Sequence, residues 1–582
     1  METDKLLKDF PPVGSAEWQT AIARNLKSAD PEKKLIWHTQ EGMAVKAFYR
    51  AEDRKGLVCV DAAPGEFPYL RGTHASGNWC IREEIDAADA EEANRQAQKA
   101  VALGAEEIAF SRDVVRTGEE LKVLLRDLDE TSIHFASADR QLMRMLIAYL
   151  NEKPRATHIS TGCDALKSVE FAAEAILAAA QGFTPFTIHA EAFGDAGATA
   201  VEEIGFALAA GVDFLAATSE CGVDVNCAAV AIEFCFAVGS NYFFEIAKLR
   251  AFRLLWARVV ESFGGSREAA RVRVAARTSR WNRTVYDPHV NILRATTEVM
   301  AAVLGGADVV SAAPFDACYR TPDETSRRLA RNTQLLLKHE AQLGCVADVG
   351  GGSYALEAIT DFLAREGWKR MQQIEVRGGF RKAQEEGTIT QALERSMNVR
   401  NQSVATRRRV LVGANWYANP VGRALDRVDP ERMNADPRGA REFEELRLRT
   451  ERHATAGGRI PRILLAEFGD LRMRAARSNF AANFFACAGF KLQMRRFRKA
   501  ADIAAAEADA IILCSADPAY VSLVADLMPK LKTLGRDVPV LVAGNPPNAE
   551  ELRRVGIADF VSLRNISVEF LTKWQERLGG KS

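Results

Sequence analysis

The feature that most constrains this chain is a unit that repeats between residues 105 and 354, made of a short apolar run, a turn and a helical stretch. Eight candidate strands recur at roughly 25–45-residue spacing, and each lacks sustained alternation, as expected for parallel strands buried on both faces. They cover residues 106–111, 132–136, 157–161, 186–190, 230–236, 272–277, 308–312 and 345–349. This pattern predicts an α/β protein with a (β/α)8 TIM barrel, and an open doubly wound sheet is the alternative.

The remaining pattern divides the chain around that barrel. Residues 1–88 mix helical and extended signals and indicate an N-terminal arm or cap, so we place the barrel at residues 89–417. Residues 418–458 are polar and interrupted by proline and glycine, which predicts a linker whose segment 438–452 forms a solvated helix. Strands at 463–466, 510–514, 538–542 and 560–562 alternate with helices, so residues 459–582 are predicted to form a flavodoxin-like open sheet.

Composition excludes several classes of protein. Lys and Arg together number 77, as do Asp and Glu, and this balance disfavours a dedicated nucleic-acid binder. No apolar run approaches the ~20 residues needed to span a bilayer, and the acidic residues 1–5 are unlike a signal peptide.

The ten cysteines include no C-x-x-C pair, so we expect buried thiols in a reducing cytoplasm. Residues 459–582 carry 19 Lys and Arg against 13 Asp and Glu, an excess expected on a solvated or subunit-facing surface.

Several short stretches are similar to one known family, and they occur in that family's order along the chain. They are residues 241–250 (N-Y-F-F-E-I-A-K-L-R), 331–334 (R-N-T-Q), Asp348 with 351–353 (G-G-S), 378–379 (G-G), 412–417 (V-G-A-N-W-Y) and 461–466 (P-R-I-L-L-A). Together they resemble the methylmalonyl-CoA mutase family from about residue 40 to the C-terminus.

The resemblance implies a particular use of the two predicted domains. In that family the barrel encloses an acyl-CoA thioester along its axis, and the flavodoxin-like domain holds adenosylcobalamin against the barrel mouth. Homolysis of the Co–C bond starts a radical rearrangement between succinyl-CoA and methylmalonyl-CoA. The cofactor supplies this isomerase chemistry, while the protein orients it and excludes water.

The C-terminal region departs from the family where cobalt is ligated. Catalytic chains carry D-x-H-x-x-G after the first strand, and the position of its histidine falls here on Met473 or Arg474. No histidine lies beyond His453, and a protonated arginine cannot replace an imidazole ligand. The family's S-x-L-x-G-G is C-S-A-D-P-A at residues 514–519, which loses the small residues that let a nucleotide tail approach. We therefore expect a degenerate cobalamin-binding domain with no cofactor-binding and no metal-ligating residue. Three arginines of this region either bind a phosphate or lie on a surface or interface: Arg472, Arg474 and Arg477.

The barrel departs from the family in the same way. Arg82 matches, but Glu84 stands at the position of the catalytic tyrosine and Ala192 at that of the catalytic histidine. The segment after residues 164–167, which normally brings an arginine to the substrate carboxylate, is short. We therefore assign no catalytic residue to this chain.

Other polar residues near the strands leave alternatives open. His189 with Glu191 ends the predicted fourth strand, where barrel active sites lie, or is a core histidine bonded to the backbone. The residues after the sixth strand either meet an anion or form structural salt bridges: Arg277, Thr278 and Arg280. Of two further histidines, His158 is predicted to lie in the third strand and His74 in a loop.

As a whole the chain resembles the small (beta) subunit of a heterodimeric, adenosylcobalamin-dependent methylmalonyl-CoA mutase. The resemblance implies a large (alpha) catalytic subunit as partner, which would carry the cofactor and be wrapped by the N-terminal arm. The alternatives are a catalytic acyl-CoA mutase chain with unusual cobalamin binding, and a non-catalytic acyl-CoA-binding or chaperone scaffold. Neither a nucleic acid nor a membrane is expected as a partner, and we expect a cytoplasmic protein.

Overall fold

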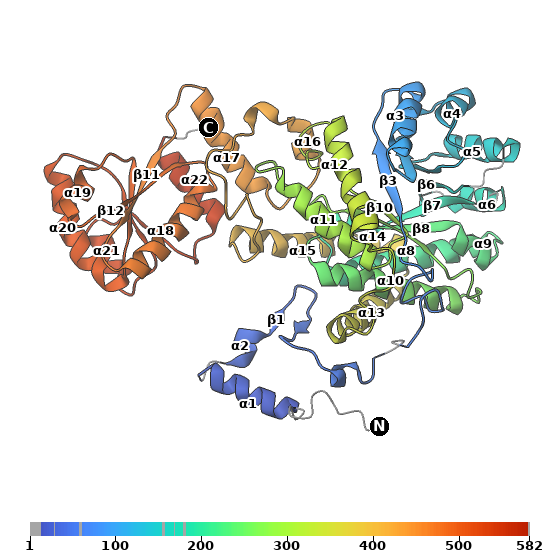
Figure 1. The fold of residues 1–582 in the computed structure, drawn as a ribbon, viewed down its shortest axis with the longest axis horizontal. Coiled ribbons are helices and arrows are strands. Elements are labelled where there is room, and N and C mark those ends of the chain that lie inside the picture. Colours follow the sequence, from blue (N-terminus) through green and yellow to red (C-terminus); the bar gives the residue numbers. More distant parts are fainter. Residues whose placement is uncertain are drawn as a thin grey trace, which may run out of the picture.

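The computed structural model describes residues 13–27, 30–57, 61–153, 157–167, 169–178 and 182–579. The acidic residues 1–5 therefore lie outside the described residues. An N-terminal arm, a barrel and a C-terminal sheet follow one another along the chain, and helices near the end of the barrel lead to the sheet (Figure 1). Within the described residues, no helix has the length and apolar character needed to cross a membrane.

Eight parallel strands close into a barrel in the order β10-β3-β4-β5-β6-β7-β8-β9. The (β/α)8 prediction is confirmed, and the open sheet is excluded for this part of the chain. The strands are β3 (Cys80–Ile85), β4 (Glu107–Phe110), β5 (Ser132–Phe135), β6 (Ile159–Asp164), β7 (Phe183–His189), β8 (Ile232–Val238), β9 (Arg273–Thr278) and β10 (Val309–Ser311).

Seven of the eight predicted barrel strands are confirmed, and one was wrong. Residues 345–349 form bends and turns, and Val346 and Val349 are 60% and 57% exposed, so this apolar run is not a buried strand. The missing strand is β3, which lies inside the segment 1–88 that we assigned to the arm. Its sequence C-I-R-E-E-I escaped notice because Arg82 on this strand is buried against charges from other strands, and the segment therefore lacks an apolar run.

Helices cover the outside of the barrel. Helices α8 and α10 are largely buried because α13 packs over both. Phe234 of β8 meets Trp256 of α10 with ring centroids 4.8 Å apart. Gly211 allows this approach, since a Cβ there would lie 2.4 Å from the Trp256 ring. The helices are α3 (Ala90–Ala102), α4 (Gly118–Leu124), α5 (Arg140–Glu152), α6 (Val169–Ala178), α7 (Ala190–Asp195), α8 (Ala200–Glu220), α9 (Val225–Val230), α10 (Tyr242–Ser262), α11 (Val290–Leu304), α12 (Glu324–Leu335), α13 (Tyr354–Glu375), α14 (Phe380–Glu385) and α15 (Thr388–Ala405).

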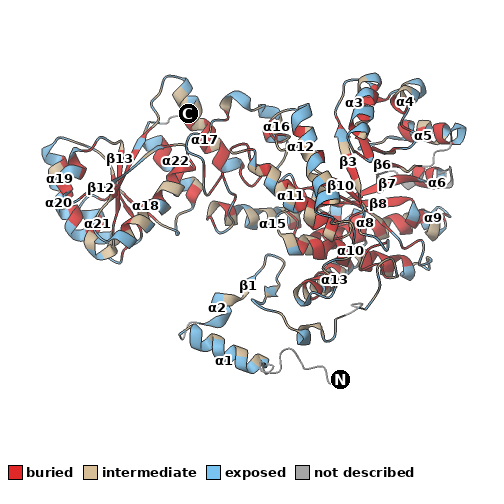
Figure 2. Ribbon diagram, viewed as in Figure 1, coloured by how far each residue is buried: buried red, intermediate tan, exposed pale blue. Residues whose placement is uncertain are grey.

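The arm has little core of its own. Helices α1 (Ser15–Asn25) and α2 (Pro31–Leu35) contain no buried residue and are drawn mostly in the exposed colour (Figure 2). A hairpin of β1 (Trp37–His38) and β2 (Ala44–Val45) joins the arm to the barrel. Trp37 meets Phe244 of α10 at 5.8 Å between ring centroids, and Gln40 donates to the Ser396 carbonyl of α15 at 2.9 Å.

The segment after the barrel contains α16 (Pro430–Ala435) and α17 (Arg441–Thr455). The prediction of a solvated helix was wrong: α17 buries six residues, and a buried ion pair of 2.6 Å joins Arg438 to Glu444. Glu444 accepts the Val285 backbone N–H from the barrel side at 2.7 Å, and Gln575 of the last helix donates to the Leu446 carbonyl at 2.7 Å. Charged side chains on most faces misled the prediction because several of them bond to groups on both neighbouring domains.

The C-terminal sheet is open and parallel, with order β12-β11-β13-β14-β15. This is the flavodoxin-like order 2-1-3-4-5, so the fold prediction is confirmed here too. The sequence did not predict the edge strand β12. The elements are β11 (Arg462–Glu467), α18 (Leu471–Ala486), β12 (Lys491–Arg496), α19 (Ala500–Ala505), β13 (Ala510–Cys514), α20 (Tyr520–Thr533), β14 (Val540–Ala543), α21 (Ala549–Arg554), β15 (Asp559–Val561) and α22 (Ser567–Arg577).

The cysteines of the described residues are free thiols, and the expectation that they are buried was wrong for three of them. The exposed ones lie in loops or a short surface helix: Cys221, Cys227 and Cys345.

Candidate functional site

Residues that carry the family resemblance meet in one buried ion-pair cluster. Arg250 of α10 bonds Asp348 through its Nε at 2.9 Å and Glu357 of α13 through Nη2 at 3.0 Å. Arg71 reaches the same two carboxylates at 2.5 and 3.2 Å. Glu357 also accepts the backbone N–H of Gly352 at 2.8 Å, and Gly352 has the left-handed φ of 83° that favours glycine. This cluster therefore ties α10, α13 and two loops together.

A second cluster of charges fills the barrel lumen. Arg82 bonds Glu107 on the neighbouring strand at 2.5 Å and approaches Glu233 on β8 at 3.7 Å. Arg273 on β9 bonds Glu233 at 3.0 Å and also pairs with Glu107 on β4. Strand β9 is three positions from β4 in the barrel order, and β3 is three positions from β8, so these pairs must cross the lumen.

Neutral groups complete this layer. His134 on β5 shares a hydrogen bond of 2.8 Å with Ser160 on β6, and its Nδ1 lies 3.5 Å from Glu233 across the barrel. Burial holds the pKa of His134 well below its usual range, so the ring is neutral at pH 7. Burial would raise the pKa of Glu107, but Arg273 and Arg82 outweigh it and hold that carboxyl far below its usual range. Protein side chains with balanced charge therefore occupy the barrel axis at this level.

The structure brings His189 and Glu191 together at the carboxyl end of β7. The ring Nδ1 lies 2.9 Å from a Glu191 oxygen, and Nε2 lies 3.0 Å from the Gly162 carbonyl. Burial alone would lower the pKa of His189, but the Glu191 hydrogen bond and charge raise it to about 9. Both ring nitrogens of this imidazolium have protein partners, so it has no free nitrogen to act as a base at pH 7.

The other positions from the sequence lie apart from this pair. Glu84 accepts a hydrogen bond of 2.8 Å from Ser311, and Ala192 lies in the short helix α7. His158 precedes β6, and burial lowers its pKa to about 3. The His74 side chain is 67% exposed and lies 3.7 Å from Asp308. Within the described part of the chain, no hydrogen bond or ion pair joins any two of these four residues.

The residues after β9 have partners in the protein. Arg277 bonds Asp195 at 2.6 Å, Arg280 bonds Asp436 at 3.1 Å, and the Thr278 hydroxyl accepts the Ala313 N–H at 2.9 Å. They line a pocket of about 290 Å³ at the carboxyl ends of β3, β9 and β10. Since each arginine has an acid, the contacts favour the salt-bridge interpretation over a free anion site.

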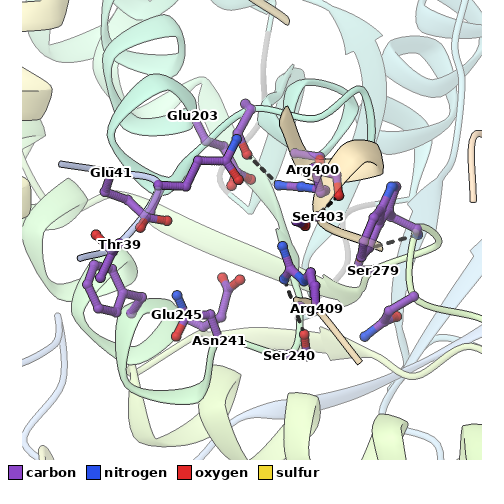
Figure 3. A pocket seen from close by; sticks show the side chains of 18 of the residues that line it. Thr39, Glu41, Glu203, Ser240, Asn241, Glu245, Ser279, Arg400, Ser403 and Arg409 are labelled. Carbon is purple, nitrogen blue, oxygen red and sulfur yellow. Dashed lines mark hydrogen bonds between the residues drawn. The ribbon is translucent and has the colours of Figure 1, made fainter. Parts of the chain in front are cut away.

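A larger pocket of about 620 Å³ lies between the arm hairpin, the carboxyl ends of β8 and β9, and α15 (Figure 3). Its floor holds a buried triad in which Lys248 bonds Glu203 at 2.7 Å and Glu245 at 2.5 Å. Burial and the charge of Glu245 raise the pKa of Glu203, and Lys248 opposes this. Arg400 and Arg409 stack on Trp281, each with its guanidinium within 5 Å of the ring centroid. Sequence reasoning missed this pocket, although Glu245 and Lys248 lie in the matching helix segment 241–250.

The crevice of the C-terminal sheet lies between β11 and β13, where strand order reverses and ligands bind in such folds. Arg477 of α18 reaches over the carboxyl ends of β13 and β14 next to this point, donating to the Ala543 carbonyl at 2.7 Å and pairing with Asp517 at 2.7 Å. A Cβ on Gly544 would clash with this guanidinium. Tyr520 adds a bond of 2.6 Å to the same Ala543 carbonyl. Met473 and Arg474 lie in the first turns of α18, and Arg474 donates to the Gly469 carbonyl at 2.6 Å.

Comparisons with known proteins agree with this architecture. The family model for methylmalonyl-CoA mutase matches residues 38–117 and 154–460. The methylmalonyl-CoA mutase small subunit of Porphyromonas gingivalis is 35% identical over 99% of both chains. The small subunit of Streptomyces virginiae is 30% identical over 99% of this chain and 98% of its own, and the large subunit of that organism is 29% identical over 76% of this chain and 67% of its own. This chain belongs to the methylmalonyl-CoA mutase family.

A comparison with solved structures adds nothing to the fold assignment. Proline utilization A from Corynebacterium freiburgense aligns over 82% of this chain and 60% of its own, with a TM-score of 0.24 and 11% identity. The barrel and the sheet are therefore argued from the strand order alone.

Proposed function

We propose that this chain is the non-catalytic small subunit of an adenosylcobalamin-dependent methylmalonyl-CoA mutase. The assignment as a small subunit is supported by two relatives that match over nearly the whole chain and are called methylmalonyl-CoA mutase small subunits. The observation that carries the non-catalytic role is the set of ion pairs across the barrel lumen. A mutase that encloses an acyl-CoA thioester needs an open axis, and here Arg82, Glu107, Glu233 and Arg273 occupy it.

Opening this lumen for a ligand would be costly. Glu107 and Glu233 are fully buried, and separating one partner from a buried pair costs about 3–5 kcal/mol. A thioester moving along the axis would have to separate several pairs at once without replacing their charges. This argues against the alternative of a catalytic acyl-CoA mutase chain.

The residues of the C-terminal crevice do not fit adenosylcobalamin. The Arg477 guanidinium fills the space next to Gly544, and residues 459–582 contain no imidazole to ligate cobalt. We therefore derive no catalytic step through this group in this chain. The cofactor belongs in our proposal to a large catalytic subunit, and the assembly acts as an isomerase in the cytoplasm.

The proposed partner is that large subunit, in a heterodimer. The arm supports this, since α1 and α2 bury none of their residues within this chain. On α1, Trp18 meets Phe48 with ring centroids 5.3 Å apart, and Phe48 is itself 51% exposed. Such helices gain most of their stability from packing, so an external surface is expected to cover them. We keep the division into arm, barrel, linker and C-terminal domain, with β3 moved into the barrel.

The test measures turnover and binding with separate and combined subunits. The purified chain with adenosylcobalamin and succinyl-CoA should give no methylmalonyl-CoA, and calorimetry should detect no saturable binding of the cofactor. Co-expression with a large subunit that carries D-x-H-x-x-G should give a stable complex with turnover. Turnover by this chain alone would overturn the proposal, and so would the lack of any complex with the large subunit.

A further inference from the structure

The edge strand β12 is exposed on both faces, which is unusual for a strand of a doubly wound sheet. Five of its six residues are exposed and Leu492 is half-buried. The opposite edge of the same sheet is different: β15 is three residues long and fully buried, and Lys573 of α22 bonds Asp559 on it at 2.7 Å. Natural sheets protect their edges by such shortening and covering. The sheet therefore has one protected edge and one open edge.

The open edge offers a row of backbone hydrogen-bonding groups. Lys491 and Phe497 donate their backbone N–H groups toward β11, to the Pro461 and Glu467 carbonyls. Because backbone groups alternate sides along a strand, the even-numbered residues direct their N–H and C=O groups to the free side. Those residues are Leu492, Met494 and Arg496.

Five cations flank these groups. Residues 491–499 (K-L-Q-M-R-R-F-R-K) contain no acid, so this stretch carries five of the six excess positive charges of residues 459–582. Among the described residues no ion pair involves any of the five: Lys491, Arg495, Arg496, Arg498 and Lys499. Arg495, Arg496 and Arg498 also line a hollow of about 600 Å³ in which Asp502 is the single acid. The excess charge noted in the sequence is thus concentrated along the open edge.

We propose that β12 is a docking edge for an extended, acidic segment of another polypeptide, which adds to the sheet as a sixth strand. Backbone pairing would supply affinity, and the five cations would select acidic side chains. Met494, with 53% of its side chain exposed, offers an apolar contact on the same strand. This inference does not rest on the proposed function.

Two other occupants fit less well. A second copy of this edge would place its five cations against five of its own kind, which is repulsive. A nucleic acid would use the charges but cannot pair with the row of N–H and C=O groups, and the chain as a whole has no net charge. A polypeptide of opposite charge satisfies both features of the edge.

The experiment uses the full chain and a fluorescent octapeptide of alternating glutamate and valine. Anisotropy should show saturable binding, and hydrogen–deuterium exchange should slow in the peptide spanning residues 491–497. The triple variant R495E/R496E/R498E should bind about tenfold more weakly or worse. The matched control K532E/R554E/R564E, which reverses three exposed charges elsewhere on the domain, should bind as the unaltered chain does.

A second probe separates strand pairing from simple charge attraction. The same octapeptide N-methylated at every residue keeps its charge but has no backbone N–H to donate along the edge, and it should bind several-fold more weakly. Equal affinity for the two peptides, or no protection of residues 491–497, would overturn the proposal. Tighter binding of a single-stranded oligonucleotide than of the peptide would also overturn it, in favour of nucleic acid. Circular dichroism confirms that each variant is folded before its affinity is interpreted.

Discussion

The barrel lumen and the C-terminal crevice are the two places where this fold family would hold its ligands, and protein side chains occupy both in different ways. In the lumen, Glu107 and Glu233 are fully buried and pair with arginines from other strands. In the crevice, the side chains of Arg477 and Asp517 are 20% and 37% exposed. The lumen is therefore closed by groups that fold as part of the core, and the crevice by groups near the surface. Removing a charge from the lumen should therefore cost more stability than removing one from the crevice.

The largest effect is expected from Arg273→Ala in the lumen. This change removes one cation and leaves Glu107 and Glu233 to share Arg82, so the free energy of unfolding should fall by about 3–5 kcal/mol. Urea unfolding measures this free energy. The control Arg95→Ala removes an exposed pair with Glu92 and should leave the free energy of unfolding nearly unchanged. Equal costs for the two variants would mean that the lumen pairs are not a buried network.

Sequence patterns located most of the strands around this lumen but could not predict its contents. The pair Arg273 and Glu107 joins residues 166 positions apart, and it depends on the register of a closed barrel. The same polar lining hid β3, because strands that carry charges inward lack an apolar run. The resemblance did single out Arg250 and Asp348, and the structure shows that the two form an ion pair. The edge strand β12 was invisible because residues exposed on both faces leave no pattern of burial in the sequence.

The next largest effect is a pH dependence of stability that comes from His189, at the carboxyl end of β7. The pKa of His189 is raised from its ordinary value near 6.5 to about 9 in the folded chain, where Glu191 outweighs burial. A raised pKa stabilises the folded state below pH 6.5, and this contribution is lost as pH rises through 9. After allowance for the partial exposure of His189, the loss should be about 2 kcal/mol.

Unfolding free energies measured from pH 6 to 9.5 test this sign. The variant Glu191→Gln removes the partner charge, so its stability should no longer fall over that interval relative to the unaltered chain. A parallel decline in both proteins would show that another group titrates there.

A smaller effect is expected from Tyr520→Phe in the crevice. The hydroxyl donates to the Ala543 carbonyl at 2.6 Å and accepts the Ser515 N–H at 3.0 Å. Removing it leaves the buried Ser515 N–H unpaired, while the Ala543 carbonyl keeps its bond from Arg477. The change should cost about 1–1.5 kcal/mol, measured by thermal or urea unfolding. Tyr417→Phe is the control, since the Tyr417 side chain is 63% exposed and its change should be near neutral. A cost as large as that of Arg273→Ala would erase the contrast between lumen and crevice.

The smallest effect should come from Arg477→Ala, which opens the crevice itself. The lost contacts are one carbonyl bond and one half-exposed ion pair, so the free energy of unfolding should fall by about 0.5–1 kcal/mol. The variant frees the space next to Gly544, yet it supplies no imidazole and keeps Asp517 and Pro518 in the following loop. Adenosylcobalamin should therefore still fail to bind, as measured by calorimetry. Binding gained by this single change would mean that Arg477 alone closes an otherwise intact cofactor site, and the crevice would then be occluded rather than degenerate.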